Sequence, residues 1–219
     1  MKRRPDKAMQ HSSYAREEND FYPTPIWVTE AVMPTLKMLV KPGVKIWEPA
    51  CGSGAICRVL EHEWTGDIYA SDLNPHPDFR KYTTNKTAEL MGKIDFLGWQ
   101  GDFSGGVIIT NPPYSGKLPA DFIRTALEKT HPDGTVAMLL RSDYDQGSTR
   151  KKLFAEAGPF FMELALSPRP IWIPGTDSGA RHYYSWFIWS WERGPNHPAL
   201  KRYYYLDDPK RNRAFGDIV

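Results

Sequence analysis

The stretch Val44-Lys45-Ile46-Trp47-Glu48-Pro49-Ala50-Cys51-Gly52-Ser53-Gly54 decides the expected fold of this chain. Its first four residues predict a short strand, a glycine-containing loop follows, and residues 55–60 have helical character. Strand, glycine loop and helix open a nucleotide-binding βαβ unit. The next strand, residues 67–71, ends at Asp72, about 20 residues beyond Gly52, where an acidic side chain meets ribose hydroxyls in such folds. We therefore expect an α/β domain with a nucleotide-like ligand.

A second motif, Thr110-Asn111-Pro112-Pro113-Tyr114, follows the apolar run of residues 107–109. The pattern predicts a buried strand that ends abruptly, because neither proline can donate to a strand ladder and each fixes its own backbone. In open α/β sheets, ligands bind at the carboxyl ends of strands, so this motif is a candidate site. Taken alone it is equally typical of a turn, because Asn-Pro commonly starts one.

Length and composition indicate one folded domain. The chain has 219 residues, of which 41% are hydrophobic and 13% aromatic, enough for a full core. Cys51 and Cys57 have no His or Cys partner at metal-ligand spacing, so we expect reduced thiols and no metal. No apolar run approaches the length of a membrane span, and the basic start leads into polar residues. These features favour a cytoplasmic protein without a membrane partner.

The order of elements divides the chain into three expected parts. Residues 1–20 are a flexible arm, residues 21–193 the main domain, and residues 194–219 a basic C-terminal tail. The domain begins with a helix that has Thr24 as its N-cap and Pro25 as its first residue, with an interruption near Pro34. Further strands are expected at residues 107–110, 135–140, 160–166 and 183–191, and residues 94–97 are expected to be a short strand or the exit of one. Further helices are expected at residues 119–129 and 148–157, and a substrate-facing loop at residues 168–182.

The glycine loop also bears on the choice of cofactor. It supplies two of the three glycines of the dinucleotide fingerprint, and Cys57 stands at the third position. A pyrophosphate would sit near the helix N-terminus, where Glu48 does not favour an anion. Glu48 is better matched to a cation. S-adenosylmethionine fits, because it carries an ammonium, a sulfonium, an adenine and a ribose for Asp72, but no phosphate.

A set of co-linear motifs resembles the class I S-adenosylmethionine-dependent DNA N6-adenine methyltransferases of the NPPY type, in their compact, phage-like form. These motifs are residues 22–25, residues 48–54, Asp72, Asp95-Phe96 and residues 111–114, within roughly residues 20–190. The resemblance implies a Rossmann-like α/β fold with a seven-stranded, mostly parallel sheet, an antiparallel last strand, and helices on both faces. It also implies the cytoplasm of a bacterium or of a phage-infected host.

The resemblance assigns roles to residues. Glu48 and the loop glycines would line the methionine moiety, Asp72 would take the ribose hydroxyls, and Asp95 would hold the adenine amine. Phe96 would lie against the adenine ring, although plain core packing is an equal alternative. The expected cofactor-binding residues are Tyr22, Thr24, Pro25, Glu48, Pro49, Ala50, Gly52, Gly54, Asp72, Asp95, Phe96 and Asn111, and the expected catalytic residues are Asn111, Pro112, Pro113 and Tyr114.

The catalytic set suits methyl transfer to an amine. The exocyclic nitrogen of adenine is a poor nucleophile because its lone pair is delocalised into the ring. If the Asn111 side-chain oxygen and the Pro112 carbonyl oxygen each accept one N–H, the lone pair points at the sulfonium methyl group. Tyr114 would stack on a base flipped out of the duplex, so that Tyr114→Phe is expected to be tolerated. No metal or ionisable base is required.

The motif at residues 111–114 indicates methylation of a planar amino nitrogen. It does not specify whether that nitrogen belongs to DNA, RNA or protein. RNA adenine or guanine amines and a protein glutamine amide pose the same geometrical problem, while the forms of the first two motifs favour DNA. A non-catalytic nucleotide-binding module is the alternative from a different class. We expect Tyr114, Arg169, Arg181 and the cluster at residues 150–152 to contact the nucleic acid. The sequence carries no signal for an oligomeric state.

Overall fold

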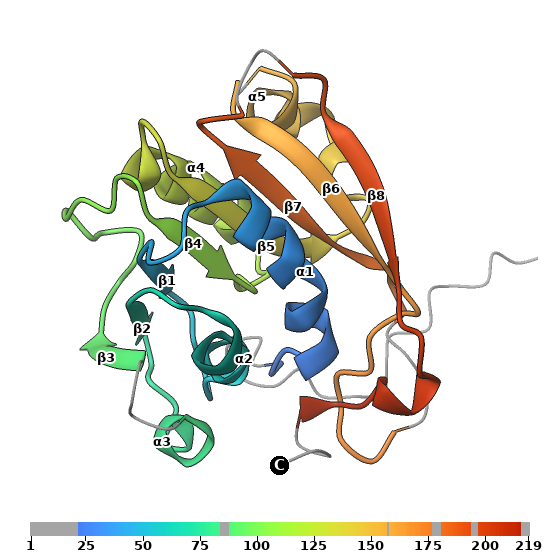
Figure 1. Cartoon of the computed structure of the whole chain (residues 1–219). Coiled ribbons are helices and arrows are strands. Elements are labelled where there is room, and N and C mark those ends of the chain that lie inside the picture. Colours follow the sequence, from blue (N-terminus) through green and yellow to red (C-terminus); the bar gives the residue numbers. More distant parts are fainter. Residues whose placement is uncertain (1–21, 84–87, 157, 177–180, 194–196, 216–219) are drawn as a thin grey trace, which may run out of the picture.

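The computed structural model describes residues 22–83, 88–156, 158–176, 181–193 and 197–215 (Figure 1). These residues build an eight-stranded sheet with the order β3-β2-β1-β4-β5-β7-β6-β8. Neighbouring strands are parallel except where β7 pairs with β5 and β6. The strands are β1 (Ile46–Glu48), β2 (Ile68–Asp72), β3 (Ala88–Lys93), β4 (Val107–Thr110), β5 (Thr135–Arg141), β6 (Phe160–Ser167), β7 (Tyr184–Ser190) and β8 (Leu200–Tyr205).

The predicted fold class is confirmed, with one strand more than the seven expected. β7 is the expected antiparallel strand, and β8 follows it as an edge strand parallel to β6. Residues 94–97, expected as a short strand or its exit, form the exit of β3. The β3 sequence Ala-Glu-Leu-Met-Gly-Lys lacks an apolar run, because an edge strand needs less burial than a central one.

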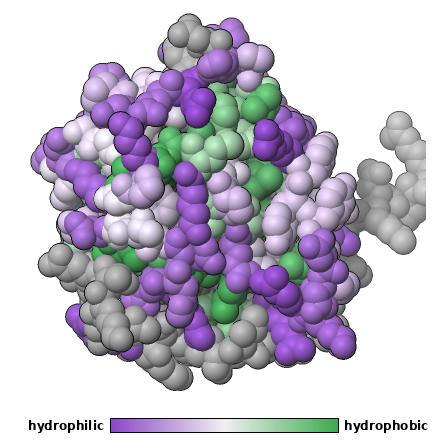
Figure 2. All heavy atoms as spheres, viewed as in Figure 1, coloured by the Kyte–Doolittle hydropathy of each residue, from purple (hydrophilic) through white to green (hydrophobic). Residues whose placement is uncertain are grey.

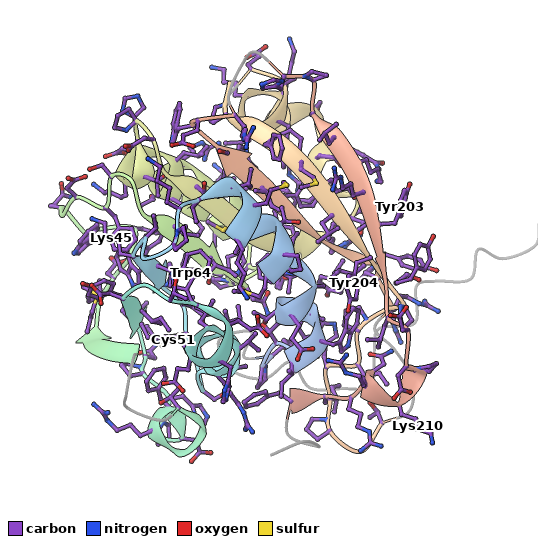
Figure 3. The ribbon with its side chains drawn as sticks, viewed as in Figure 1. Lys45, Cys51, Trp64, Tyr203, Tyr204 and Lys210 are labelled. Atoms are coloured by element: carbon purple, nitrogen blue, oxygen red, sulfur yellow. The ribbon has the colours of Figure 1, made fainter. Side chains whose placement is uncertain are left out.

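Part of the expected C-terminal tail is therefore strand β8. Tyr204 points back toward helix α1 (Ile26–Leu39), where its ring stacks on Trp27 at a centroid distance of 6.1 Å, and Tyr203 points outward (Figure 3). This alternation of a packed and an exposed ring follows from the two-residue period of a strand. A short 3-10 helix, η4 (Pro209–Arg211), comes next. The expected arm at residues 1–20 lies outside the described residues.

Helices cover both faces of the sheet, as expected. Strand β5 shows the division, because Ala137 and Leu139 pack in the same core as helix α1, whereas Val136 and Met138 pack on the opposite side. The helices on the α1 side are α1 and α2 (Ala55–Glu63), those on the opposite side are α4 (Leu118–Thr130) and α5 (Lys151–Phe154), and the remaining helical turns are α3 (Phe79–Tyr82), η2 (Tyr144–Gln146) and η3 (Ser148–Arg150).

Three local predictions about helices were wrong. Pro25, not Thr24, is the N-cap of α1, and no side chain caps it. The helix also runs unbroken through Pro34, which is exposed, so the backbone carbonyl that loses its amide partner can be hydrated. The helix expected at residues 148–157 is the short pair η3 and α5, and it ends at Phe154.

The surface seen in Figure 2 is the face on which α1 lies. Hydrophilic side chains cover most of this face, and hydrophobic ones gather over β6 and its neighbouring strands. No described helix has the length and apolar composition needed to cross a membrane.

Candidate active site

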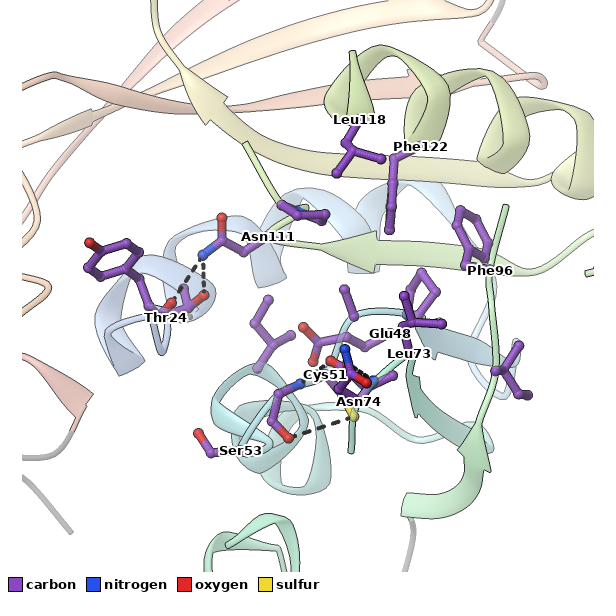
Figure 4. A pocket seen from close by; sticks show the side chains of 18 of the residues that line it. Thr24, Glu48, Cys51, Ser53, Leu73, Asn74, Phe96, Asn111, Leu118 and Phe122 are labelled. Atoms are coloured by element: carbon purple, nitrogen blue, oxygen red, sulfur yellow. Dashed lines mark hydrogen bonds between the residues drawn. The ribbon is translucent and has the colours of Figure 1, made fainter. Parts of the chain in front are cut away.

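A pocket of about 410 Å³ opens where β1, β2 and β4 end, at the carboxyl edge of the sheet (Figure 4). Its described lining contains three carboxylates, Glu48, Asp72 and Asp95, and no Lys, Arg or His. The predicted site residues that line it are Tyr22, Thr24, Glu48, Pro49, Ala50, Gly52, Asp72, Asp95, Phe96, Asn111 and Pro113. Pro25, Gly54, Pro112, Tyr114, Arg169 and Arg181 are not among its lining residues.

The glycine loop shapes the pocket through its backbone. Gly52 and Gly54 have φ angles of +48° and +86°, in the left-handed region that favours glycine. A Cβ atom on Gly54 would lie 2.8 Å from Cγ2 of Thr83. Gly54 is also the N-cap of helix α2. Gly54 therefore lies next to the pocket without lining it, and its left-handed backbone lets the loop turn tightly into α2.

Glu48 ends strand β1 and is only 2% exposed. The Cys57 thiol donates a hydrogen bond to its Oε2 atom at 3.3 Å, and the Cys57 backbone amide also interacts with the carboxylate. Burial raises the pKa of the Glu48 carboxyl well above its ordinary value, and the nearby Asp72 charge adds to this. A desolvated carboxylate whose donors come from a single residue is only partly compensated. The pocket thus offers a place where a cationic group would be favourable.

Asp72 ends strand β2 and is held by two backbone amides. Gly52 N–H donates to its Oδ2 atom at 2.9 Å, and Asn74 N–H donates to Oδ1 at 2.8 Å. Each carboxylate oxygen keeps a lone pair for a further donor. The carboxylate is thus fixed in position and still able to accept hydrogen bonds from a diol.

Asp95 and Phe96 follow β3 and differ in surroundings. Asp95 is exposed, and its Oδ1 atom accepts the Leu97 N–H at 3.1 Å. Phe96 is 2% exposed, and its ring lies 5.3 Å from that of Trp47 and 5.1 Å from that of Phe122. Phe96 therefore packs in the core and also lines the pocket, and its contact with an adenine ring stays a prediction.

Asn111 follows β4, and its amide orientation is defined by its partners. Nδ2 donates to Thr24 Oγ1 at 3.2 Å and lies 3.4 Å from the Tyr22 carbonyl oxygen (Figure 4). The Tyr22 oxygen can only accept, so Nδ2 must face it and Oδ1 must face the other way. Thr24 thus supports Asn111 rather than capping α1.

Tyr114 reaches the Asn111 oxygen through its hydroxyl group. The hydroxyl oxygen lies 2.6 Å from Asn111 Oδ1 and 2.9 Å from the Leu139 carbonyl oxygen. It has one hydrogen and donates to one of these acceptors at a time. The ring is half-buried and meets Tyr184 edge-on at 6.1 Å. Sequence reasoning assigned the ring a role and missed the hydroxyl.

The basic residues expected at the substrate lie outside the pocket. Arg169 and Arg181 are exposed and flank the carboxyl end of β6 and the start of β7, at the edge of the sheet that carries the pocket. The Arg169 guanidinium lies 5.4 Å from the Tyr183 ring centroid. In the cluster at residues 150–152, Arg150 lies 3.7 Å from the Tyr144 ring centroid and Lys151 pairs with Glu156 at 2.7 Å, and a role of the cluster in substrate contact stays a prediction.

Several lining residues were missed. Leu73 and Asn74 directly follow Asp72, so the strand-end rule could have found them. Leu118 and Phe122 come from α4, and only the packing of that helix beside β4 brings them to the pocket. Ser53 is buried, and its hydroxyl has no hydrogen-bond partner among the described residues. The described residues contain no cluster of His, Cys, Asp and Glu suited to a metal ion.

Comparisons with known proteins identify the fold. Neither a protein-family model nor a curated protein matches the sequence. A similar solved structure from Listeria monocytogenes is described as a class I S-adenosylmethionine-dependent methyltransferase. Its TM-score is 0.62, and it has 16% sequence identity over 90% of this chain and 69% of that one. A type I restriction-modification methyltransferase subunit from Streptococcus thermophilus has a TM-score of 0.62 and 17% identity over 88% of this chain and 50% of that one.

A protein from Pyrococcus horikoshii described as an RNA methyltransferase is also similar, with a TM-score of 0.59 and 14% identity over 78% of this chain and 88% of that one. The chain therefore has the fold of class I methyltransferases. It spans half the length of the Streptococcus thermophilus subunit that it matches.

Proposed function

We propose that this protein is an S-adenosylmethionine-dependent methyltransferase that acts on the N6 amine of adenine in DNA. One observation carries the proposal: a fixed Asn111 amide stands at the rim of a pocket whose described lining is acidic and free of basic side chains. Such a lining disfavours a phosphate-bearing cofactor and favours a cationic one. The similarity to methyltransferase structures supports the same choice of cofactor.

The pocket residues fit this cofactor by their chemistry. Glu48 would compensate for a positive group, Asp72 would accept hydrogen bonds from the ribose diol, and Asp95 would accept one from the adenine amine. The unpartnered Ser53 hydroxyl would offer a donor to the carboxylate of the methionine moiety. When bound, S-adenosylmethionine would supply the methyl group and a sulfonium as the leaving group.

Asn111 would prepare the target nitrogen. Its Oδ1 atom accepts one hydrogen bond from Tyr114 and keeps a second lone pair for an amine hydrogen. Because Nδ2 is held by Thr24 and Tyr22, the oxygen cannot turn away without loss of those contacts. The Pro112 carbonyl would accept the second amine hydrogen. Acceptors fixed before the substrate arrives are the main way in which an enzyme stabilises developing charge.

DNA is preferred to RNA and to protein glutamine because the Glu48-to-Gly54 loop and the residue 22–25 motif resemble the DNA enzymes. We assign methyl transfer to residues 21–193 and substrate contact to the loop at residues 168–182. A module without catalysis is disfavoured by the hydrogen bonds that join Asn111 to Thr24 and Tyr114, which binding of a nucleotide alone would not require.

The test is identification of the methylated product. The protein is incubated with methyl-labelled S-adenosylmethionine and separate panels of DNA, RNA and protein, and the products are digested and analysed by mass spectrometry. N6-methyladenine from DNA is expected, and Asn111→Ala serves as the matched control. Methylated RNA bases or methylglutamine would overturn the DNA assignment, and no transfer to any panel would overturn the enzymatic one.

A further inference from the structure

The chain after β8 folds back to the start of α1 and is joined there by one side chain. Asn212 Oδ1 accepts hydrogen bonds from Trp27 Nε1 and from Ile171 N–H, each at 3.2 Å. Its Nδ2 atom donates to the Arg169 carbonyl oxygen at 3.1 Å. Asn212 thus ties three distant segments together: helix α1, the loop after β6, and the C-terminal segment.

Two hollows lie next to Asn212 and its partner Trp27. One, of about 500 Å³, is lined by Ile171, Gly175, Thr176, Pro209, Lys210, Asn212 and Arg213. The other, of about 240 Å³, is lined by Ile26, Trp27, Lys210, Arg211 and Arg213. Lys210 and Arg213 line both hollows. We call these two hollows together the basic cup.

The charged side chains among the described lining of the basic cup are all cations. Arg211 pairs with Glu30, so its charge is met within the chain. Lys210 and Arg213 are exposed and have no ion pair with any described residue. No described Asp or Glu lines either hollow. Lys210 lies at the outer surface of η4 (Figure 3). The chemistry of the cup therefore suits an anion.

The basic cup lies close along the chain to the pocket. Residues 22–24 line the pocket, and Ile26 and Trp27, at the start of the following helix, line the smaller hollow. Arg169, whose carbonyl Asn212 holds, is a further exposed cation beside the cup. A long polyanion could thus contact the cup while one of its units reaches Asn111.

We propose that the basic cup binds backbone phosphates of duplex DNA, with Lys210 and Arg213 as the contacting cations. This inference rests on the proposed function and names the second contact of the same substrate. Each cation that neutralises a phosphate releases a condensed counterion, which makes binding salt-dependent. Asn212 is a positioning residue, because it sets the place of the C-terminal segment against the loop.

The test is binding of a labelled DNA duplex at several salt concentrations, measured by fluorescence anisotropy. For Lys210→Ala/Arg213→Ala we expect weaker binding and a slope of log affinity against log salt reduced by about 1.8, because each phosphate contact contributes about 0.9. Lys210→Arg/Arg213→Lys keeps both charges and should restore the slope. The matched control is Lys41→Ala/Arg193→Ala, which removes two exposed cations at the opposite edge of the sheet.

The outcomes separate this inference from the proposed function. If the double alanine variant keeps the salt slope of the control while the unaltered protein still methylates DNA, the cup is not a phosphate site and the function stands. If the slope falls as expected but no methyl transfer occurs, the cup stands and the function fails. Tighter binding of RNA than of duplex DNA would contradict both. Unchanged S-adenosylmethionine binding in each variant would show that the fold is intact.

Discussion

The pocket and the basic cup lie at the same edge of the sheet and carry opposite charges. The described lining of the pocket has three carboxylates and no cation, whereas that of the cup has cations and no carboxylate. The pocket is built around a carboxylate that is 2% exposed, and the cup around exposed side chains. The contrast indicates two ligands: a small cation held out of water, and a polyanion held at the surface.

The largest effect is expected from Asn111→Ala, which would remove the side chain proposed to hold the target amine of the DNA against the cofactor. Loss of one fixed group that stabilises developing charge costs about 10²–10³-fold in kcat. We expect a loss of that order in the methyl-transfer rate, with little change in S-adenosylmethionine affinity. Asn111→Asp loses the donor to Thr24 and Tyr22. Because it keeps an acceptor oxygen for the amine, it should retain more activity than Asn111→Ala. Near-normal turnover in the alanine variant would refute the mechanism.

Glu48→Gln tests the acidic side of the contrast. Removal of one member of a buried charge pair costs about 2–5 kcal/mol, so cofactor affinity should fall by at least about 30-fold. Cofactor binding is measured by calorimetry. Glu163→Gln is a control that removes another buried carboxylate, one that already has Lys201 at 2.6 Å and Ser185 at 2.8 Å as partners. It should leave cofactor affinity unchanged.

Glu48→Gln should weaken cofactor binding but should stabilise the cofactor-free protein against unfolding. Burial raises the pKa of Glu48, so the folded state binds its proton more tightly than the unfolded state does. Its contribution to stability is thus complete below the unfolded pKa of about 4.3 and is lost as pH rises through the folded pKa. Without cofactor, Glu48→Gln should be the more heat-stable form as pH rises. A melting-temperature difference that does not change with pH would contradict this account.

Tyr114→Phe is expected to have the smallest effect. It removes the hydroxyl that lies 2.6 Å from Asn111 Oδ1 and leaves the ring. A single hydrogen bond contributes about 0.5–1.5 kcal/mol, so kcat should fall by no more than about 10-fold while KM for DNA is retained. Tyr114→Ala should also raise KM, because stacking of a base on an aromatic ring contributes about 1–3 kcal/mol. A much larger loss in Tyr114→Phe would show that the hydroxyl matters more than stacking.

The sequence predicted the pocket better than the cup. Glu48 and Asp72 each end a strand and Asn111 directly follows one. Parallel strands bring such residues to one edge, so their meeting follows from the order of elements. Lys210 and Arg213 are brought to the loop after β6 by Asn212 and by β8, a strand that was expected to be part of a basic tail. Contacts between segments so distant in sequence leave no local pattern.

The same limit explains the errors within the pocket. Thr24 was expected to cap α1, because its type and place suit an N-cap, yet its hydroxyl accepts from Asn111, 87 residues away. Gly54 was expected to bind cofactor, which stays a prediction, and its closeness to Thr83 and Phe79 gives its lack of a side chain a packing role as well. Residue type and spacing indicated that these positions matter, and tertiary contacts decided how.

The most direct test of the central claim is equilibrium dialysis of the free protein with labelled S-adenosylmethionine, with unlabelled ligands as competitors. The acidic pocket predicts saturable binding at one site per chain, displaced by S-adenosylhomocysteine and left in place by ATP or a nicotinamide dinucleotide at equal concentration. Displacement by the phosphate-bearing ligands, or no saturable binding of S-adenosylmethionine, would contradict the account.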